Sequence, residues 1–302
     1  MVPRARALLH DTVWRGAAPR DVPDDVLAAA LALARRNRVE ATLARAYAPR
    51  LSQEAASLDA HSQAFRRNLR ASSVVLRAAG VVPILIKADP ALDYVYSNFD
   101  LVVGEDCWDP AVTALRSWTS REWGHPLERD KILFAPESGP AVHLHRSVGW
   151  FEVPIISAES GLRDRARYDD DAGCLIPARH DRLRIVLAHA AFQNLALDLA
   201  DLCEIRDLAH DDAVAAALRE ARIEGWGRAF GAFLAWSARL IRHLDAGEPL
   251  ASPAPAPVGP ALGAGLEHAR ASASRNRLAT AAREVVLRPV LVAAKRRRFV
   301  HV

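Results

Sequence analysis

Short apolar segments with strand character lie between long helical stretches, and this alternation constrains the fold more than any other feature of the chain. Four segments are predicted as strands, at 84–87, 99–103, 131–136 and 141–148. Alanine- and leucine-rich stretches with helical periodicity lie before and after them, at about 21–68, 180–209 and 213–244. The pattern predicts an α/β (α+β) fold, with a small mixed sheet flanked by helical N- and C-terminal segments.

Changes in periodicity and proline content divide the chain into five parts. A segment with five prolines, GEPLASPAPAPVGP, is predicted to be a stiff extended connection because proline cannot continue a helix or donate a backbone hydrogen bond. The predicted parts are a helical N-terminal segment (1–79), an α/β core (80–176), a helical C-terminal subdomain (177–246), the proline-rich linker (247–260) and a basic helical tail (261–302).

Composition limits the class of protein. The chain has 302 residues, 51% of them hydrophobic, which is enough to bury a sizeable core. Its formal net charge is only +4 and its arginines alternate with acidic residues, so nucleic acid is not indicated as a partner. Cys107, Cys174 and Cys203 are too far apart for a cysteine zinc cluster and do not suggest a disulfide framework, which predicts a reducing, cytoplasmic location. No stretch reaches the roughly 20 apolar residues of a membrane span.

The end of the chain carries four consecutive basic residues, at 295–298, after the segment VVLRPVLVAA. One interpretation is a solvated helix end whose positive charges complement the helix dipole. The alternative is a basic amphipathic helix that makes a weak contact with a membrane or another anionic partner.

Polar residues at alternate positions occur on two of the predicted strands. Asn98 and Asp100 are spaced i, i+2, and so are His143 and His145, so the two members of each pair point to the same side of a strand. If the two strands are neighbours, Asp100, His143 and His145 form a two-histidine, one-carboxylate cluster suited to iron, zinc or manganese, with Asn98 as a hydrogen-bonding neighbour. The alternative is that one histidine hydrogen-bonds in a polar core and the other faces solvent.

Several blocks in a fixed order resemble a known family. ILIK (84–87), YSNFDLVV (96–103) and AVHLHRSV (141–148) are followed by HDRLRIVLAHAAF and DLADLCEIRDLA. Over about 80–210 this order is similar to that of the uncharacterised nucleotidyltransferases, bacterial members of the polymerase-β-like superfamily. The corresponding family blocks read L-L-K-G, G-D-I-D-L-L-V and D-L-H-W, and then histidines on a helix before an aspartate.

The resemblance implies that the α/β core at 80–176 is nucleotidyltransferase-like. It also implies a cleft in which three carboxylates hold two magnesium ions and a nucleoside triphosphate. Residue by residue it puts Ser97 at the family's glycine, Asn98 at its first aspartate and Asp100 at its second. His143 stands at the third aspartate, and His145 and Lys87 match the family's histidine and lysine. The resemblance thus implies Asp100, Lys87 and His143 as catalytic residues and Lys87, Ser97 and Asn98 as cofactor-binding residues.

Substitution of two of the three aspartates changes the expected metal. Asn98, Asp100 and a neutral His143 supply one negative charge where the family supplies three, and magnesium binds imidazole poorly. Magnesium or manganese is therefore expected if the usual chemistry survives, and iron, zinc or manganese if the histidines are ligands. The resemblance also implies that Asp201 lies near the cleft, whereas His189 is predicted to be a buried, hydrogen-bonded core residue.

Three hypotheses about function remain. The first is a nucleotidyltransferase-family protein that binds a nucleotide or a phosphorylated small molecule in a bacterial biosynthetic pathway, with Asp100 on the metal and Lys87 on phosphate. The second is a catalytically silent member of this fold that binds a peptide, a protein or a metabolite. The third is a repurposed enzyme whose metal ligands are Asp100, His143 and His145.

Overall fold

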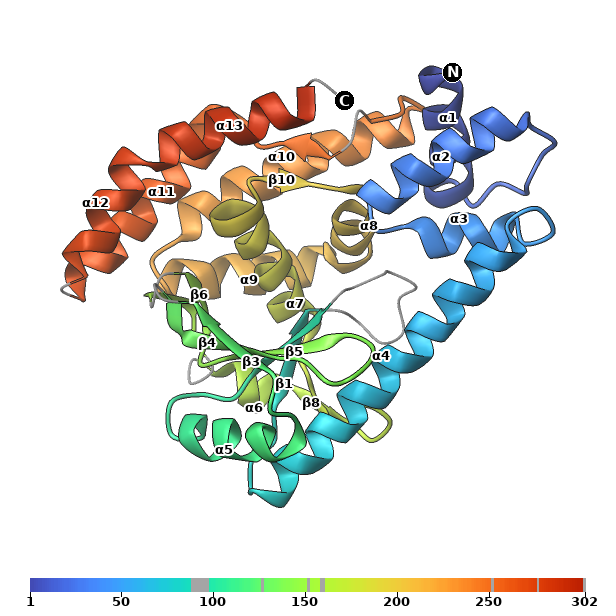
Figure 1. Cartoon of the computed structure of the whole chain (residues 1–302). Helices are drawn as coiled ribbons and strands as arrows, with labels where there is room; N and C mark the ends of the chain where they lie inside the picture. The colour runs from blue at the N-terminus through green and yellow to red at the C-terminus, as the bar shows by residue number, and fades with distance from the viewer. Residues whose placement is uncertain are drawn as a thin grey trace.

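A computed structural model shows a mixed sheet with helices on both sides (Figure 1). It describes residues 1–87, 98–125, 128–150, 153–157, 161–250, 253–275 and 277–300, with the side chains of Lys87, His125 and 295–300 outside the description. Among these residues no helix has the length and apolar character that a membrane crossing needs. The three cysteines are free, and burial raises the pKa of the Cys174 thiol to about 12.

The N-terminal part is helical, as its periodicity predicts. Its elements are α1 (Val2–Leu9), the π-helical turn η1 (His10–Trp14), α2 (Asp24–Arg36), α3 (Glu40–Ala46) and α4 (Ser52–Ala78). Helix α2 illustrates why: Val26, Leu27 and Ala30 recur at helical spacing and are buried. Its acidic residues lie in the first turn and its arginines in the last, where each complements the helix dipole.

Seven strands form a mixed sheet in the order β3-β4-β5-β2-β1-β9-β8. The strands are β1 (Ile84–Lys87), β2 (Asn98–Val102), β3 (Glu122–His125), β4 (Glu128–Phe134), β5 (Ala141–His145), β8 (Arg167–Asp169) and β9 (Cys174–Ile176). β2 pairs with β5 in parallel and β1 with β9 in parallel, and the other pairs are antiparallel. The predicted segment 141–148 ends as a strand at His145, because Val148 belongs to a separate hairpin of β6 (Val148–Trp150) and β7 (Val153–Ile156).

The two faces of the sheet belong to different hydrophobic cores. Phe99, Leu101 and Leu144 point to one face and pack in a core with α4 and α5 (Trp108–Trp118). Ile84 and Val102 point to the other face and join the larger core of the N- and C-terminal helices. Because strand side chains alternate, Asp100, His143 and His145 lie on the face toward the larger core.

After β7 the chain forms a second set of helices. These are α6 (Arg163–Arg165), α7 (Arg179–Ala188), the π-helical segment η3 (His189–Asn194), α8 (Leu199–Leu208), α9 (Asp211–Ile223) and α10 (Gly227–Asp245). Two predicted helices were wrong in extent. The run over 180–209 is interrupted at Leu195, which has a left-handed backbone (φ 52°), and the run over 213–244 is interrupted at Gly225 (φ 85°).

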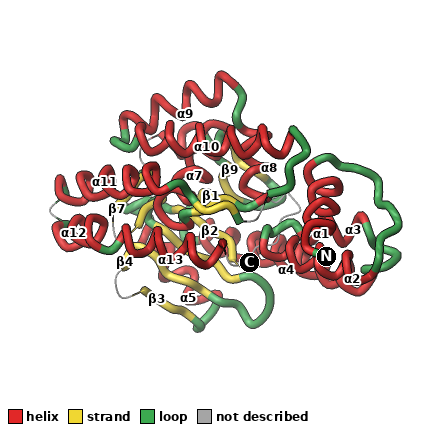
Figure 2. The backbone as a smooth tube through the Cα atoms, turned by 90° about the horizontal axis from the view of Figure 1, so that it is seen from above, coloured by secondary structure: helices red, strands yellow, loops and turns green. Residues whose placement is uncertain are grey.

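The proline-rich segment and the tail pack onto the rest of the molecule. β11 (Ala254–Pro255) pairs with β10 (Ala196–Leu197), so part of the predicted linker is a strand, and α11 (Val258–Ser274) begins before its end. Helices α12 (Leu278–Val286) and α13 (Arg288–Val300) follow. Figure 2 shows α11, α12 and α13 beside one another, and Val292 of α13 is buried in the larger core.

Candidate metal site

Two central strands bring the predicted ligands together. β2 and β5 run parallel in a register that sets Asp100 beside His143 and Val102 beside His145. Both strands have neighbours on each side, β1 next to β2 and β4 next to β5, so the backbone that positions these side chains is held by hydrogen bonds on both edges. The i, i+2 spacing then places both histidines on the face that carries Asp100.

The distances within this group are short. His143 Nδ1 lies 3.2 Å from Asp100 Oδ1, and His145 Nε2 lies 3.4 Å from the same oxygen. The two imidazole rings are 4.2 Å apart between centroids. One potential ligand atom from each residue lies within 4.8 Å of those of the other two, so a single ion can contact all three. Among the described residues, no other set of three or more histidine, cysteine, aspartate or glutamate side chains brings its ligand atoms this close together.

Burial is uneven around the group. Asp100 and His145 are 2% and 5% exposed, whereas the side chain of His143 is 26% exposed. The group therefore has an accessible side at His143. Asn98 lies two residues before Asp100 on the same strand. Its Nδ2 atom is 3.5 Å from Asp100 Oδ1, at the limit of a hydrogen bond.

His145 is a neutral imidazole in this environment. Burial lowers its pKa to about 3; the nearby Asp100 carboxylate opposes this shift, while His143 and Lys131 add to it. Neither ring nitrogen of His145 makes a well-formed hydrogen bond among the described residues, although Nε2 lies 3.4 Å from Asp100 Oδ1. Buried polar atoms without partners are costly, and a neutral imidazole nitrogen is a metal ligand.

The spacing suits a tetrahedral ion. Zinc with bonds of about 2.0–2.1 Å holds its ligand atoms about 3.3 Å apart, close to the separations of both histidine nitrogens from Asp100 Oδ1. Two imidazoles and one carboxylate are also a donor set that zinc, iron and manganese accept.

A lysine that sequence analysis did not single out lies at the same site. Lys131 is the register partner of His145 and is 7% exposed. Its ammonium group lies 3.3 Å from Glu128 Oε1 and 5.5 Å from the centre of the Trp150 ring. The alternation in KILF placed Lys131 on one face of a strand, but the identity of the neighbouring strand could not be deduced from it.

The remaining predicted site residues have different outcomes. Lys87 is the register partner of Asp100 on β1, and its side chain is outside the description, as is Ser97 altogether. Asp201 forms a capping box with Asp198 at the start of α8 and contacts Arg38, so its observed contacts are those of a helix cap. His189 is buried, and its Nδ1 hydrogen-bonds to the Ile185 carbonyl at 2.9 Å, as predicted.

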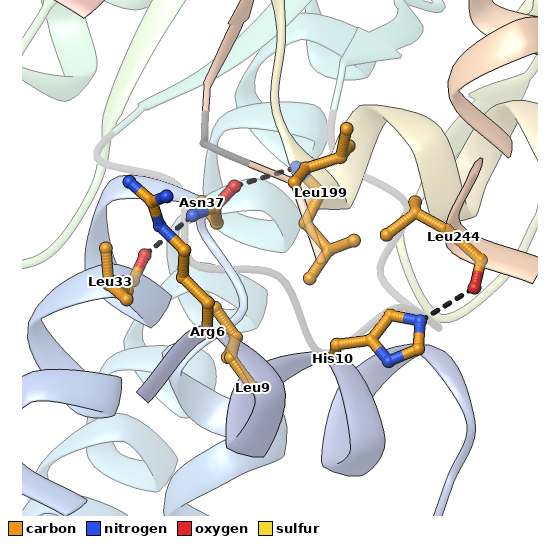
Figure 3. Close-up of a pocket in the computed structure, with 8 residues that line it drawn as sticks. Arg6, Leu9, His10, Leu33, Asn37, Leu199 and Leu244 are labelled. Atoms are coloured by element: carbon orange, nitrogen blue, oxygen red, sulfur yellow. Dashed lines mark hydrogen bonds between the residues drawn. The ribbon is translucent and has the colours of Figure 1, made fainter. Parts of the chain in front are cut away.

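A separate pocket lies where α1, α2, α8 and α10 meet (Figure 3). Two of its polar side chains are hydrogen-bonded: His10 Nε2 contacts the Leu244 carbonyl at 2.7 Å, and Asn37 binds the Leu33 carbonyl and the Leu199 amide. The His10–Leu244 and Asn37–Leu199 bonds join segments far apart in the sequence, which gives these two side chains a structural role. Its lining is Arg6, Leu9, His10, Leu33, Asn37, Leu199, Leu244 and Leu250.

Fold and site together define an α/β protein with a two-histidine, one-carboxylate cluster on the central strands of a mixed sheet. Comparisons of the chain with protein-family models, with curated proteins and with solved structures find no match.

Proposed function

We propose that the chain binds one divalent transition-metal ion through Asp100, His143 and His145, with zinc as the best fit. The observation that carries this proposal is the convergence of three ligand atoms within 4.8 Å on adjacent strands. The neutral imidazole of His145 supports it, because coordination would give a ligand bond to a buried ring that makes no well-formed hydrogen bond among the described residues.

Three protein ligands favour a reactive site over a closed structural one. Structural zinc sites use four protein ligands, whereas catalytic sites use three and leave a position for water or substrate. The exposed edge of His143 is the side from which a substrate reaches the group. An ion bound there would supply Lewis-acid chemistry, and Lys131 would contribute positive charge beside it.

Zinc titration of chelator-treated protein by calorimetry tests the proposal. We expect one equivalent of zinc to bind, and Asp100→Asn or His143→Gln to weaken binding by at least about tenfold because each removes a ligand. His210→Gln is the matched control, since His210 is exposed at the N-cap of α9, outside the cluster. Equal affinities for Asp100→Asn and the wild type would refute a site at this cluster.

A second candidate function is binding of a nucleotide or a phosphorylated small molecule beside this metal. One observation favours it: Lys87, Asp100 and His143 are successive register partners across β1, β2 and β5, so three blocks that resemble the nucleotidyltransferases lie in one row. In this proposal Lys87 neutralises phosphate and Asp100 holds the metal, which together would make the chain a transferase.

Calorimetry with ATP, GTP, CTP and UTP, in the presence of magnesium, manganese or zinc, tests this second function. We expect Lys87→Ala to weaken nucleotide binding without changing zinc affinity, and Lys295→Ala to change neither. Zinc binding without any nucleotide binding would favour the repurposed metal enzyme. Absence of both would favour a catalytically silent protein that binds a peptide, protein or metabolite.

A further inference from the structure

Helices α12 and α13 bury a charged pair, Glu284 and Arg288. Glu284, Arg288 and Val292 recur every four residues and are all buried, so they form the inner face of the pair. Arg288 binds Glu284 Oε2 at 2.7 Å, the Ala261 carbonyl at 2.7 Å and the Ala191 carbonyl. These contacts fix α13 on α11 and η3, along the outer edge of the helical half in Figure 1.

The outer face of the same helices is apolar. Between 285 and 294 every exposed residue is apolar, and the one charged residue, Arg288, is buried. Val286 and Val290 are 66% and 63% exposed. The large apolar side chains that face outward on α12, on α13 and at their junction are Leu278, Val285, Val286, Leu287, Val290 and Leu291.

This orientation is the reverse of that expected for a helix pair in water. A surface helix normally turns its apolar stripe to the core and its charges to solvent. Here a charged pair is buried and a row of valines and leucines is exposed, and both features are unfavourable in an aqueous setting. A contiguous exposed apolar face of this kind marks an interaction surface.

The charges around the face indicate its partner. From 285 to 302 the sequence contains five lysines and arginines and no aspartate or glutamate, and four of the five follow the apolar face directly as Lys-Arg-Arg-Arg. Apolar residues next to a basic run are typical of helices that lie in the interface of an anionic bilayer. A symmetric contact with a second copy made by residues 285–302 would leave both basic runs without acidic partners, because this segment contains none.

We propose that α12 and α13 dock the protein on an anionic lipid surface, with the outward valines and leucines in the headgroup region and residues 295–298 attracted to the lipid charge. The buried Arg288 and Glu284 hold the pair in the orientation that keeps its apolar face outward. This proposal is independent of the metal site.

Co-sedimentation of the full chain with vesicles tests this. We expect binding to phosphatidylcholine vesicles that contain phosphatidylglycerol, and much weaker binding to phosphatidylcholine alone. Replacing residues 295–298 by glutamine should lower the partition coefficient by about 100-fold or more, since each basic residue near an anionic surface contributes roughly fivefold. Val286→Asp with Val290→Asp should also abolish binding.

Ile223→Asp is the matched control, because Ile223 is 75% exposed at the end of α9, away from the tail. It should bind vesicles as the wild type does. All of these positions are exposed or lie at the chain end, so thermal melts should show that the variants stay folded. Two results would overturn the proposal. One is a chain that self-associates, does not bind vesicles, and dissociates when it carries Val286→Asp and Val290→Asp. The other is vesicle binding that this double variant leaves unchanged.

Discussion

His145 and His189 are both buried, yet their ring nitrogens have different environments. His189 Nδ1 binds the carbonyl of Ile185, one helical turn before it, so this contact is set by local sequence. His145 makes no well-formed hydrogen bond among the described residues, and its Nε2 lies 3.4 Å from Asp100 Oδ1, 45 positions earlier. The H-x-H and N-x-D spacings predicted which side chains share a strand face. They could not predict that the two strands are adjacent, or that Lys131 lies beside them.

A double substitution at this site tests which metal its charge selects. Asn98→Asp with His143→Asp would give three carboxylates, and we expect magnesium to raise the melting temperature of this variant and leave the wild type unchanged, because hard oxygen ligands suit magnesium. At 100 times the dissociation constant the gain is about 2.7 kcal/mol. Without metal the variant should be less stable than the wild type, since neighbouring carboxylates repel.

Thermal melts across a magnesium titration are the measurement. Asn98→Asp with His210→Asp serves as the control, because it adds the same number of acidic residues but only one of them at the cluster. A magnesium response in the wild type equal to that of the double variant would show that the natural residues do not restrict the metal.

At the scale of helices and strands, the sequence predicted element types better than element ends. The four predicted strands correspond to β1, β2, β4 and β5, because short β-branched runs between turns are a strong local signal. The break at Leu195 had no such signal, since leucine rarely adopts a left-handed backbone. It is compatible with the tertiary structure: β10 follows at once and pairs with β11, some 60 residues away.

The orientation of α12 and α13 could not be predicted from local sequence either. Their helical character is apparent, but burial of Arg288 depends on a gap in α11. A Cβ atom at Gly265 would lie 2.1 Å from Arg288 Cδ and 2.8 Å from its Nε, so only glycine leaves room for the guanidinium. A glycine inside a helical sequence pattern does not indicate which side chain will pack against it.

Gly265→Ala should therefore destabilise the tail, although alanine is the better helix former. We expect a loss of about 1–3 kcal/mol from overpacking, because Arg288 is held by three groups and cannot move aside. Gly263→Ala, two residues earlier with nothing within 4 Å of the added Cβ, should be neutral or stabilising. Hydrogen exchange in α13 measures both variants, and equal protection in the two would contradict the role of Gly265.

Glu284 should make attachment of the tail pH-dependent. Burial raises the pKa of Glu284, but contact with His268 and Arg288 outweighs burial, and the net pKa lies below the usual 4.5. The pKa of Glu284 is therefore lower in the folded chain than in the unfolded chain. The stabilising contribution of Glu284 is complete above pH 4.5 and is lost as the pH falls through the folded-state pKa.

Melting temperatures of the wild type and Glu284→Gln across pH measure this contribution. At neutral pH we expect the variant to be less stable by about 3 kcal/mol or more, because it leaves Arg288 buried with one charge partner fewer. Below pH 4.5 the difference should shrink as Glu284 of the wild type becomes protonated. A difference that stays constant across this range would show that the ionised carboxylate is not what holds the tail.

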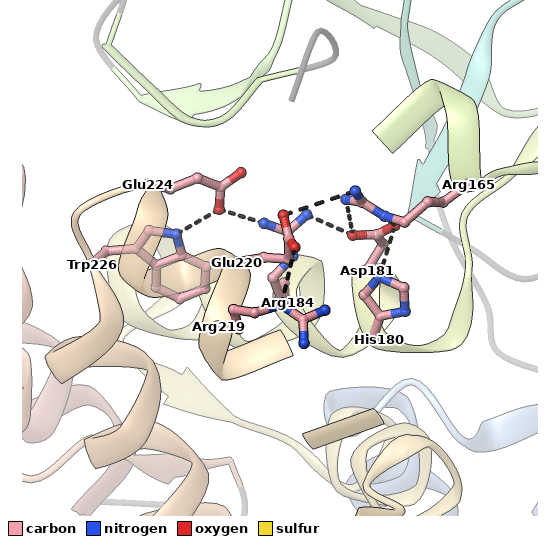
Figure 4. A network of polar contacts seen from close by, with 8 residues as sticks. All are labelled: Arg165, His180, Asp181, Arg184, Arg219, Glu220, Glu224 and Trp226. Atoms are coloured by element: carbon pink, nitrogen blue, oxygen red, sulfur yellow. Dashed lines mark hydrogen bonds and ion pairs between the residues drawn. The ribbon is translucent and has the colours of Figure 1, made fainter. Parts of the chain in front are cut away.

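For the whole molecule, hydrophobic cores and an ionic network join the sheet to the N- and C-terminal helices. The sheet contributes one face to each of two hydrophobic cores, so both cores found among the described residues include sheet side chains. A buried ionic network adds a polar connection (Figure 4). In it, Arg165, which precedes β8, donates two 3.0 Å hydrogen bonds to Asp181 of α7. Asp181 also binds Arg184, and Arg184 contacts Glu224, the residue after α9.

Asp181→Asn should weaken this connection and lower the stability of the whole chain. Asp181 and Arg184 are both 0% exposed, and removing one charge leaves a buried guanidinium incompletely compensated, at a cost of about 3–5 kcal/mol. Asp59→Asn is the control, because its pair with Arg45 is exposed and such pairs contribute only about 0–1 kcal/mol.

Denaturant unfolding of the single and double variants separates the network's charge from its packing. Replacing Asp181 and Arg184 together by leucine and methionine removes both charges and keeps most of the volume, so we expect it to recover much of the stability that Asp181→Asn loses. Arg165 is partly exposed, so water can solvate it once its partner is gone, and Glu224 keeps the hydrogen bond from Trp226 Nε1 once Arg184 is gone. A double variant no more stable than Asp181→Asn would mean that α7 needs the ion pair itself to stay on the sheet. An Asp181→Asn loss no larger than that of Asp59→Asn would mean that the two hydrophobic cores hold the layers together without it.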